Sequence, residues 1–426
     1  MAATLLRRGC YDNRDIKFEI EATTAAYEEE MAAMKKLGPA VEVSPATKRL
    51  LLELQHEKTA LEGLYVQATG QEYSPPVPIC RREMKALQMF FEAMHGRRWR
   101  DLAGWLGRSK TSNMRGVQPF SCNPWCWYGV ECGVGEVQEL LLSTNQLQGA
   151  LPGAALADMH GLITLDLSDN EIEGILPPEL GKMVHLQYLR LAVTKLQGEI
   201  PQALGQIKGL RELDLSSARL CGRIPGFPSR GAKLTVLNLS HNKLNGPIPS
   251  DMGNLRRLRE LNLGHNRVTG PVPPSFGELV GLRSLNLSCN DLTGPLTPWL
   301  GKLTSLTRLL LDHNKLSGCL PKTIQYLRAL EARRLHLQFN NLSGVIPGCL
   351  GHLKDLKILN LAGNRLEGKL PPEIGLMTKL SGLELGNNHI VGPFPTELGS
   401  LSRLLDLHFV KGYPSYSLPL HRGFTR

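Results

Sequence analysis

The stretch LNLSHNKLNGPIPSDMGNLRRLRE, residues 237–260, decides the fold because two near copies of it follow directly. Residues 261–284 read LNLGHNRVTGPVPPSFGELVGLRS, and residues 285–308 read LNLSCNDLTGPLTPWLGKLTSLTR. Leucine, asparagine and glycine therefore recur at the same places in each copy. A fixed period of about 20–50 residues indicates a repeat architecture, in which stacked neighbours bury one continuous core.

One column of residues shows how far the repeat extends. The column holds Asn145, Asn170, Thr194, Ala218, Asn242, Asn266, Asn290, Asn314, Asn340, Asn364 and Asn388. The spacing between neighbouring members of this column is constant, except that it is one residue longer between 145 and 170 and two residues longer between 314 and 340. A degraded twelfth copy follows at LLDLHFVKG, residues 404–412. A period of about 24 residues with L-x-x-L-x-L-x-x-N-x-L predicts an α/β solenoid, a right-handed leucine-rich-repeat superhelix of about 11–12 repeats over residues 137–411.

Each part of one repeat has a physical role. Leu237 and Leu239 are two residues apart and point to the core from a strand, while Val236, Asn238 and Ser240 face solvent. The column asparagines form a structural ladder, because a buried amide must bond backbone groups of neighbouring turns. Thr194 and Ala218 interrupt the ladder, either by drift or to change the local twist. We expect the two-residue insertion before residue 340 to lengthen a helix on the far side.

The chain before the repeats divides into three parts. Residues 1–72 predict a helical extension, whose leucines 50, 54, 61 and 64 share one face and favour packing or self-association. Residues 73–80 are a linker, and residues 81–136 form a cap that begins with a helix over about 82–95. Residues 412–426 are a C-terminal tail.

Two motifs carry a resemblance to a known family. The second half of the repeat reads LxGxIP, as at residues 244–249, and the cap contains CWYGVEC at residues 126–132. Both resemble the plant-type leucine-rich-repeat family of receptor-like kinases, receptor-like proteins and polygalacturonase inhibitors. The resemblance implies a plant-type N-terminal cap in which Trp99, Trp105 and Trp127 cover the first repeat. It also implies a disulfide between Cys126 and Cys132.

The start of the chain and the length of its apolar runs indicate the cellular compartment of the protein. The start, MAATLLRRGC, lacks the basic-then-apolar order of an export signal, and no apolar run reaches membrane-spanning length. We therefore expect a cytoplasmic protein as written. The alternatives are a secreted or cell-surface recognition protein whose export signal is missing, or a fragment of a leucine-rich-repeat receptor kinase. Three asparagines, at positions 238, 286 and 341, stand in N-glycosylation sequons.

No pattern of residues predicts catalysis. The sequence contains no phosphate loop, HExxH, GxSxG or kinase motif set, so we expect no enzyme, no catalytic residue and no cofactor. His241, His265, Cys289 and His313 recur at one repeat position and could line up as metal ligands, but these residues are ordinary fillers there, so we expect no metal. The net charge of +10 is spread among interspersed acidic and basic residues, so we expect no nucleic-acid partner.

The remaining candidate site is the concave face formed by the outward strand positions. Twelve strands would make it roughly 50–55 Å long. We predict that its ligand-binding residues are Tyr188, Arg190, Asp214, Asn238, Glu260, Arg308, Asp312, Arg334, His336 and Phe339. Acidic residues concentrate in the earlier repeats, and arginine and aromatic residues gather around 308–339. The expected function is recognition of a protein or peptide, without chemistry of its own.

Overall fold

The computed structural model describes residues 81–102, 105, 127–132, 136–228, 232–330 and 335–408, together with Ile20, Thr23, Thr24, Glu28, Leu54, Gln55 and Lys58. The linker, the tail, most of the extension at residues 1–72, Cys126 and Arg334 lie outside the described residues. What the sequence predicts for them stays a prediction. The chain falls into two compact units, Met1–Ile172 and Glu173–Arg426.

The first unit contains the cap and the first strands. Its elements are α4 (Arg81–Ala93), the 3-10 helix η1 (Gly96–Arg98), β1 (Val130–Cys132), β2 (Val137–Leu141), β3 (Gln148–Ala150), α5 (Gly153–Asp158), β4 (Thr164–Asp166) and β5 (Glu171–Glu173), whose last residue belongs to the second unit. Strand β1 is antiparallel to β2, which is parallel to β4. Helix α4 forms where the pattern predicted it and buries Leu87, Phe90 and Phe91, and Met94 is buried directly after the helix.

Three tryptophans close the cap. Trp99, Trp105 and Trp127 are 4%, 0% and 1% exposed. The centroid of the Trp105 ring lies 4.8 Å from that of Trp99 and 4.8 Å from that of Trp127. The indole nitrogen of Trp105 donates to the Tyr128 carbonyl at 2.9 Å, and that of Trp99 donates to the Met94 carbonyl at 2.8 Å. The three rings thus form one buried aromatic cluster, in which the N–H bonds of Trp99 and Trp105 stay within the cap.

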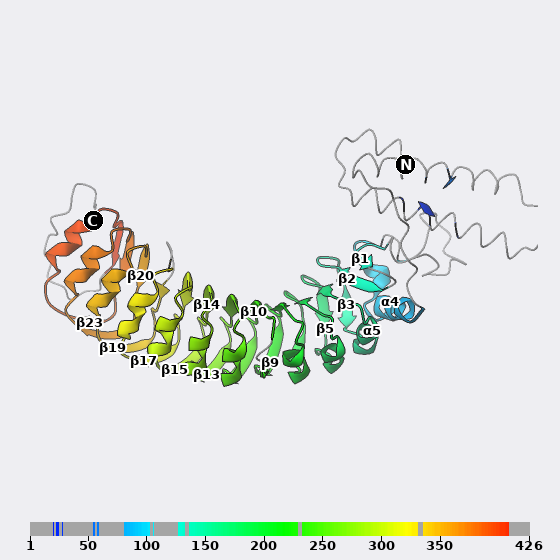
Figure 1. The fold of residues 1–426 in the computed structure, drawn as a ribbon, viewed down its shortest axis with the longest axis horizontal. Coiled ribbons are helices and arrows are strands. Elements are labelled where there is room, and N and C mark those ends of the chain that lie inside the picture. Colours follow the sequence, from blue (N-terminus) through cyan, green and yellow to red (C-terminus); the bar gives the residue numbers. More distant parts are fainter. Residues whose placement is uncertain are drawn as a thin grey trace, which may run out of the picture. The chain divides into compact units, whose positions relative to one another are not determined.

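The second unit repeats one turn that consists of a strand, a second short strand and a 3-10 helix (Figure 1). The first strands are β6 (Tyr188–Arg190), β8 (Glu212–Asp214), β10 (Val236–Asn238), β12 (Glu260–Asn262), β14 (Ser284–Asn286), β16 (Arg308–Leu310), β18 (Leu335–His336), β20 (Ile358–Asn360), β22 (Gly382–Glu384) and β24 (Asp406–His408). They form one parallel sheet in that order. The last of them lies in the degraded twelfth repeat.

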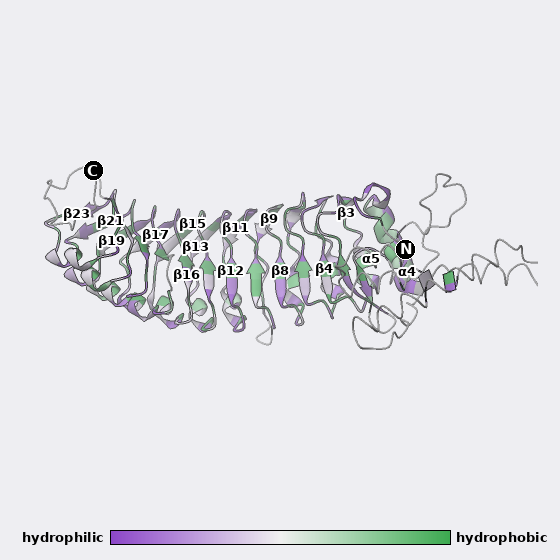
Figure 2. Cartoon of the chain, turned by 90° about the horizontal axis from the view of Figure 1, so that it is seen from above, coloured by the Kyte–Doolittle hydropathy of each residue, from purple (hydrophilic) through white to green (hydrophobic). Residues whose placement is uncertain are grey.

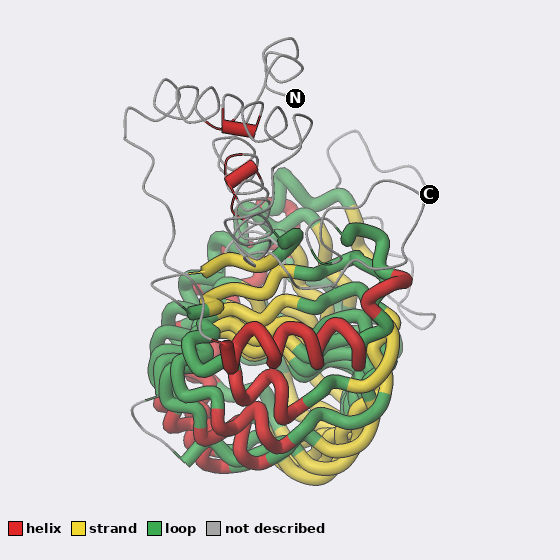
Figure 3. Tube along the Cα trace, turned by 90° about the vertical axis from the view of Figure 1, so that its right-hand side faces the viewer, coloured by secondary structure: helices red, strands yellow, loops and turns green. Residues whose placement is uncertain are grey.

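The rest of each turn carries a second short strand and a 3-10 helix, and the helices lie on a different side from the strands of either sheet (Figure 3). A second parallel sheet is made by β7 (Gln197–Glu199), β9 (Arg219–Arg223), β11 (Lys243–Pro247), β13 (Arg267–Pro271), β15 (Asp291–Pro295), β17 (Lys315–Gly318), β19 (Asn341–Val345), β21 (Arg365–Gly368) and β23 (His389–Ile390). The 3-10 helices are η3 (Pro178–Lys182), η4 (Gln202–Gln206), η5 (Ser250–Asn254), η6 (Pro274–Glu278), η7 (Pro298–Lys302), η8 (Lys322–Tyr326), η9 (Gly348–His352), η10 (Pro372–Leu376) and η11 (Thr396–Ser400).

The sequence of one repeat explains its conformation. Leu237 and Leu239 are fully buried, as the alternation predicted. Pro249 precedes η5, and its fixed φ suits the entry to a helical turn. Ser240 corrects an expectation, because it was assigned to the solvent side and is only 3% exposed. Its hydroxyl donates to the Asn238 side-chain oxygen at 2.8 Å, which explains why a serine is tolerated there.

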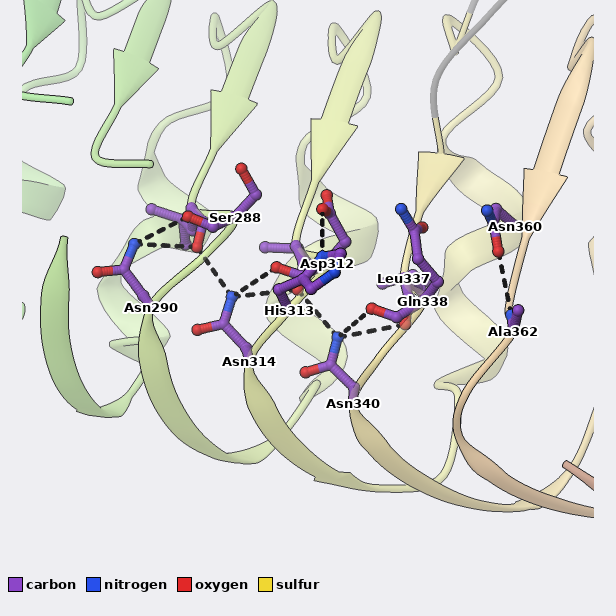
Figure 4. A network of polar contacts seen from close by, with 12 residues as sticks. Ser288, Asn290, Asp312, His313, Asn314, Leu337, Gln338, Asn340, Asn360 and Ala362 are labelled. Atoms are coloured by element: carbon purple, nitrogen blue, oxygen red, sulfur yellow. Dashed lines mark hydrogen bonds and ion pairs between the residues drawn. The ribbon is translucent and has the colours of Figure 1, made fainter. Parts of the chain in front are cut away.

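The asparagine ladder links each turn to the one before it (Figure 4). The Asn290 amide donates to the carbonyls of Leu263 at 2.9 Å, Leu287 at 3.2 Å and Ser288 at 3.1 Å, and its oxygen accepts from the Val268 N–H at 2.9 Å. Within each unit, the same kind of amide-to-backbone bonds is made by Asn145, Asn170, Asn242, Asn266, Asn314, Asn340, Asn364 and Asn388. At position 194 a threonine hydroxyl donates only to the Leu191 carbonyl, at 3.0 Å. Ala218 has no side-chain group that could make such bonds.

The inserted residues before Asn340 do not lengthen a helix. Helix η8 has five residues, as η7 and η9 do. The extra residues fall between Leu330 and Leu335, next to the strand side, where residues 331–334 lie outside the described part. The expectation of a longer helix was therefore wrong, because the leucine spacing up to Leu330 keeps the helical side unchanged.

Candidate ligand-binding face

Parallel pairing in uniform register arranges the outward side chains of the second unit into rows. Val236 lies between Glu212 and Glu260, and Asn238 lies between Asp214 and Asn262. Along the sheet the first row is Tyr188, Glu212, Val236, Glu260, Ser284, Arg308, Ile358, Gly382 and Asp406. The second row is Arg190, Asp214, Asn238, Asn262, Asn286, Leu310, His336, Asn360, Glu384 and His408. We call these two rows the strand face; hydrophilic and hydrophobic residues lie side by side along it (Figure 2).

The predicted binding residues divide into three groups in the structure. Tyr188, Arg190, Asp214, Asn238, Glu260, Arg308 and His336 lie on the strand face. Asp312 and Phe339 lie in the turns that follow β16 and β18, so they border the face and do not belong to a strand. Arg334 lies outside the described residues. The predicted set therefore includes the face and part of its edge, spread over several repeats.

The N-terminal part of the strand face satisfies its own charges. The Arg190 guanidinium donates to both carboxylate oxygens of Glu212, at 2.7 and 2.8 Å. It also lies 5.6 Å from the centre of the Tyr188 ring. A two-point contact of this kind fixes the arginine in one orientation. A ligand here would meet a rigid, nearly neutral surface.

Asparagines make the middle of the face rigid. The Asn238 amide nitrogen donates to an Asp214 carboxylate oxygen at 3.1 Å. Its oxygen accepts from the Ser240 backbone N–H and hydroxyl, and the Asn286 oxygen accepts the same pair from Ser288. These amides are therefore held by the turn behind them and present a fixed polar surface.

One further row follows the strands, at the residue directly before each ladder asparagine. His241, His265, Cys289, His313 and Phe339 all have φ between 53° and 57° there. The left-handed conformation directs their side chains along the edge of the strand face. The rings of His241 and His265 stack at 4.2 Å, and those of His313 and Phe339 lie 4.5 Å apart. We call this row the turn row.

Phe339 is the one large apolar side chain of the turn row. It is 49% exposed, and the His313 ring covers one of its sides. On the next turn is Gly363, where an added Cβ would lie 2.6 Å from the Phe339 ring carbon Cδ1. The ring is thus held between a histidine and a glycine and still faces solvent. Exposed aromatic side chains with fixed positions are typical of binding hot spots.

Three groups that can ligate metals lie together at the turn row. One ligand atom each of Cys289, Asp312 and His313 lies within 4.8 Å of the others. The His313 Nδ1 is 3.0 Å from the Asp312 carboxylate (Figure 4). Burial, followed by the nearby Asp312 charge, raises the pKa of the Cys289 thiol, so the thiol form is favoured. Our prediction of no metal did not consider Asp312, which precedes His313 in the chain and which the folded turns bring beside Cys289.

A cluster of basic residues at the edge of the strand face was missed. A shallow hollow of about 450 Å³ is lined by five basic side chains, Arg211, Lys233, Arg256, Arg257 and Arg259. We call it the basic hollow. We had expected the arginines to gather around residues 308–339. The overlooked signal is that Lys233 and Arg257 hold the same position in consecutive repeats, and that Arg211 and Arg259 both stand directly before a strand.

The fold and its ladder define a leucine-rich-repeat solenoid, and comparison with protein families agrees. Leucine rich repeats match residues 135–196, 208–268 and 331–390 by one family description, and residues 281–303 and 305–327 by a second. Together these matches cover more than half of the chain. The chain belongs to the leucine-rich-repeat family, and its relatives place it with the plant type.

The curated relatives are much longer proteins. The "LRR receptor-like serine/threonine-protein kinase RGI3" of Arabidopsis thaliana is 38% identical over 68 residues, which are 16% of this chain and 6% of the kinase. The chain thus matches only a small fraction of that relative's length. Among the described residues, no helix is both long enough and apolar enough to cross a membrane.

Solved structures show the same fold over most of the chain. The ectodomain of the Arabidopsis receptor kinase HAESA, in complex with an IDA peptide hormone ligand, superposes with a TM-score of 0.61 at 29% identity. That match covers 77% of this chain and 57% of the ectodomain. A plant ice-binding protein superposes with a TM-score of 0.56 at 26% identity, over 74% of this chain and 97% of that protein.

Proposed function

We propose that this protein is a non-enzymatic binding protein, which recognises a peptide or protein segment along the strand face. The observation that carries the proposal is Phe339, a half-exposed aromatic ring held between His313 and Gly363 beside that face. Arg308 adds an exposed cation on the neighbouring strand β16. An aromatic anchor next to a fixed polar surface supplies both affinity and orientation.

The ligand is an extended peptide segment in this proposal. The rows of side chains repeat about every 4.8 Å along the stack, so a chain laid across the strands meets successive rows. The HAESA ectodomain, which has the same fold, is in complex with a peptide hormone ligand. That similarity also favours the cell surface or the extracellular space over the cytoplasm that we expected from the sequence.

The test is selection of peptides from a random display library on the full chain, followed by affinity measurement with two variants. Phe339→Ala removes the anchor and should weaken the selected peptides by at least tenfold, which corresponds to about 1.4 kcal/mol. Tyr326→Ala is the matched control, because Tyr326 is 50% exposed and lies on helix η8, away from the strand face. Equal loss in both variants, or none in either, would count against the strand face as the binding site.

A further inference from the structure

The basic hollow brings together five cations with little internal compensation. Arg211, Lys233, Arg256, Arg257 and Arg259 line it, and all are exposed. Among the residues that the structure describes, the one carboxylate in an ion pair with any of them is Glu278, 3.0 Å from Arg256. Glu212, the residue after Arg211, is already bound by Arg190. The remaining positive charges repel one another across the hollow, so a bound anion would stabilise it.

The repeat geometry places the backbone segments that carry these charges on the same side of the solenoid. Thr235 follows Arg211 by one turn and Arg259 follows Thr235 by another, since the Thr235 N–H donates to the Arg211 carbonyl at 2.7 Å and the Arg259 N–H donates to the Thr235 carbonyl at 2.8 Å. Successive turns lie about 4.8 Å apart, so the backbones at Arg211 and Arg259 are separated by roughly 10 Å. Glu260, next in the chain, belongs to the strand face, because it pairs in register with Val236 and successive residues of a strand point to opposite sides.

A glycine leaves the hollow open at its far end. Lys233, Arg257 and Gly281 occupy the same position in three successive repeats, and the third has no side chain. A Cβ added at Gly281 would meet nothing closer than the Arg256 carbonyl oxygen at 3.9 Å. The glycine is therefore not required by packing at that point, and its effect is to leave space beside Arg256 and Arg257.

We propose that the basic hollow is a binding site for a small polyanion that carries phosphate or sulfate groups. Guanidinium groups donate paired N–H bonds that match tetrahedral oxyanions, and several such groups converge here. The volume of about 450 Å³ lies in the range of small-molecule sites and exceeds the needs of a single oxyanion. The site does not depend on peptide binding at the strand face.

The experiment uses titration calorimetry of the full chain with three compact probes at constant ionic strength. Inositol hexakisphosphate presents phosphates, sucrose octasulfate presents sulfates, and citrate presents carboxylates. We expect one binding site for at least one of the first two, tighter than for citrate, with an affinity that falls as salt is added. The stronger of the two identifies the group. Absence of saturable binding by both would overturn the proposal.

Two variants at Gly281 distinguish the effect of an added charge from the effect of an added side chain on probe binding. Gly281→Glu places a carboxylate in the hollow, whereas Gly281→Gln places a neutral side chain of the same size there. Because an added Cβ at Gly281 meets no atom closer than 3.9 Å, both variants should fold like the parent. We expect Gly281→Glu to weaken the probe by tenfold or more relative to Gly281→Gln. Equal affinities of the two variants would contradict the site.

Substitution of Arg257, which lines the basic hollow, provides the second test. Arg257→Gln should weaken binding about tenfold, since a charge-assisted hydrogen bond is lost. The matched control is Arg267→Gln, which removes another exposed arginine, on strand β13 of the second sheet. If both changes weaken the probe equally, binding reflects overall charge and the proposed site is wrong.

Discussion

At the scale of the residue, the position before each ladder asparagine has an unusual backbone. Non-glycine side chains such as His313 and Phe339 stand there with φ near 54°. That conformation costs on the order of 1–2 kcal/mol for a residue with a Cβ. The ladder bonds of the following asparagine offset this cost. The same conformation aligns the side chains of the turn row beside the strand face.

A substitution at Gly363 tests how the turn row holds the Phe339 ring. It has φ of 64°, and a Cβ there would lie 2.6 Å from the Phe339 ring. Gly363→Ala should lower the free energy of unfolding by about 1 kcal/mol or more and displace the ring. Urea unfolding measures the loss. The control is Gly399→Ala, where no atom lies within 4 Å of the added Cβ, and unchanged stability in both variants would refute the contact.

The ladder itself can be tested at one asparagine. Asn290→Ala leaves the Leu263 carbonyl and the Val268 N–H without their side-chain partner in the core. We expect a loss of about 2–3 kcal/mol in the free energy of unfolding. Asn245→Ala, at an exposed asparagine of strand β11, should change it by less than about 0.5 kcal/mol. A loss at residue 290 no larger than at residue 245 would mean that the ladder contributes little.

At the scale of the element, helix α4 is tied to strand β2 by a buried carboxylate. Glu83 is 2% exposed and accepts from the Val137 N–H at 2.8 Å. Burial raises the pKa of Glu83 above 4.5, and the nearby Glu136 adds to this, while the Val137 bond opposes it. The folded state therefore holds the proton more tightly than the unfolded chain does, and ionisation destabilises the cap.

The raised pKa of Glu83 makes the free energy of unfolding depend on pH. Below pH 4.5 both states are protonated and the stability from Glu83 is fully present; it declines as the pH rises through the higher folded pKa and then stays level. Glu83→Gln lacks this titration. Urea midpoints from pH 4 to 8 should therefore move in favour of the variant as the pH increases. A difference that stays constant over this range would show that Glu83 has an ordinary pKa.

The three N-glycosylation sequons lie on two different sheets. Asn341 is exposed on strand β19 of the second sheet, whereas Asn238 and Asn286 are half-buried on the strand face. Asn238 also uses its amide nitrogen to bond Asp214. If the protein is exported, mass spectrometry of protein from its native cells should find glycan at residue 341 and bare asparagines at 238 and 286. Glycan at the latter two would cover the face that we propose for binding.

At the scale of the whole molecule, the predicted helices of residues 1–72 raise the question of self-association. The leucine face at positions 50, 54, 61 and 64 predicts packing within the chain or self-association, and Leu54 is 7% exposed in the single chain. We expect sedimentation equilibrium of the full chain to give a mass above one chain of 47.0 kDa, and deletion of residues 1–72 to abolish the increase. A monomer at high concentration would exclude pairing through this segment.

Much of this architecture follows from the sequence by itself. A regular period with leucines at fixed positions has one compact solution, because each repeat can bury its leucines only against its neighbours. The ladder asparagines and the outward strand positions were assigned on that basis, whereas the tryptophans of the cap came from the resemblance to the plant-type family. Local pattern suffices here because contacts in a solenoid run between adjacent turns at known spacing.

The tertiary structure alone decided which surface groups meet. Asp312 lies beside Cys289, and Arg211 shares a hollow with Arg256, because successive turns of the solenoid stack these residues close together. The repeat pattern places residues such as Lys233 and Arg257 at equivalent positions of successive turns, but it does not select the rotamers that bring their charged ends together. Whether Arg190 is available to a ligand or already bound to Glu212 depends on rotamers that only the folded neighbours select.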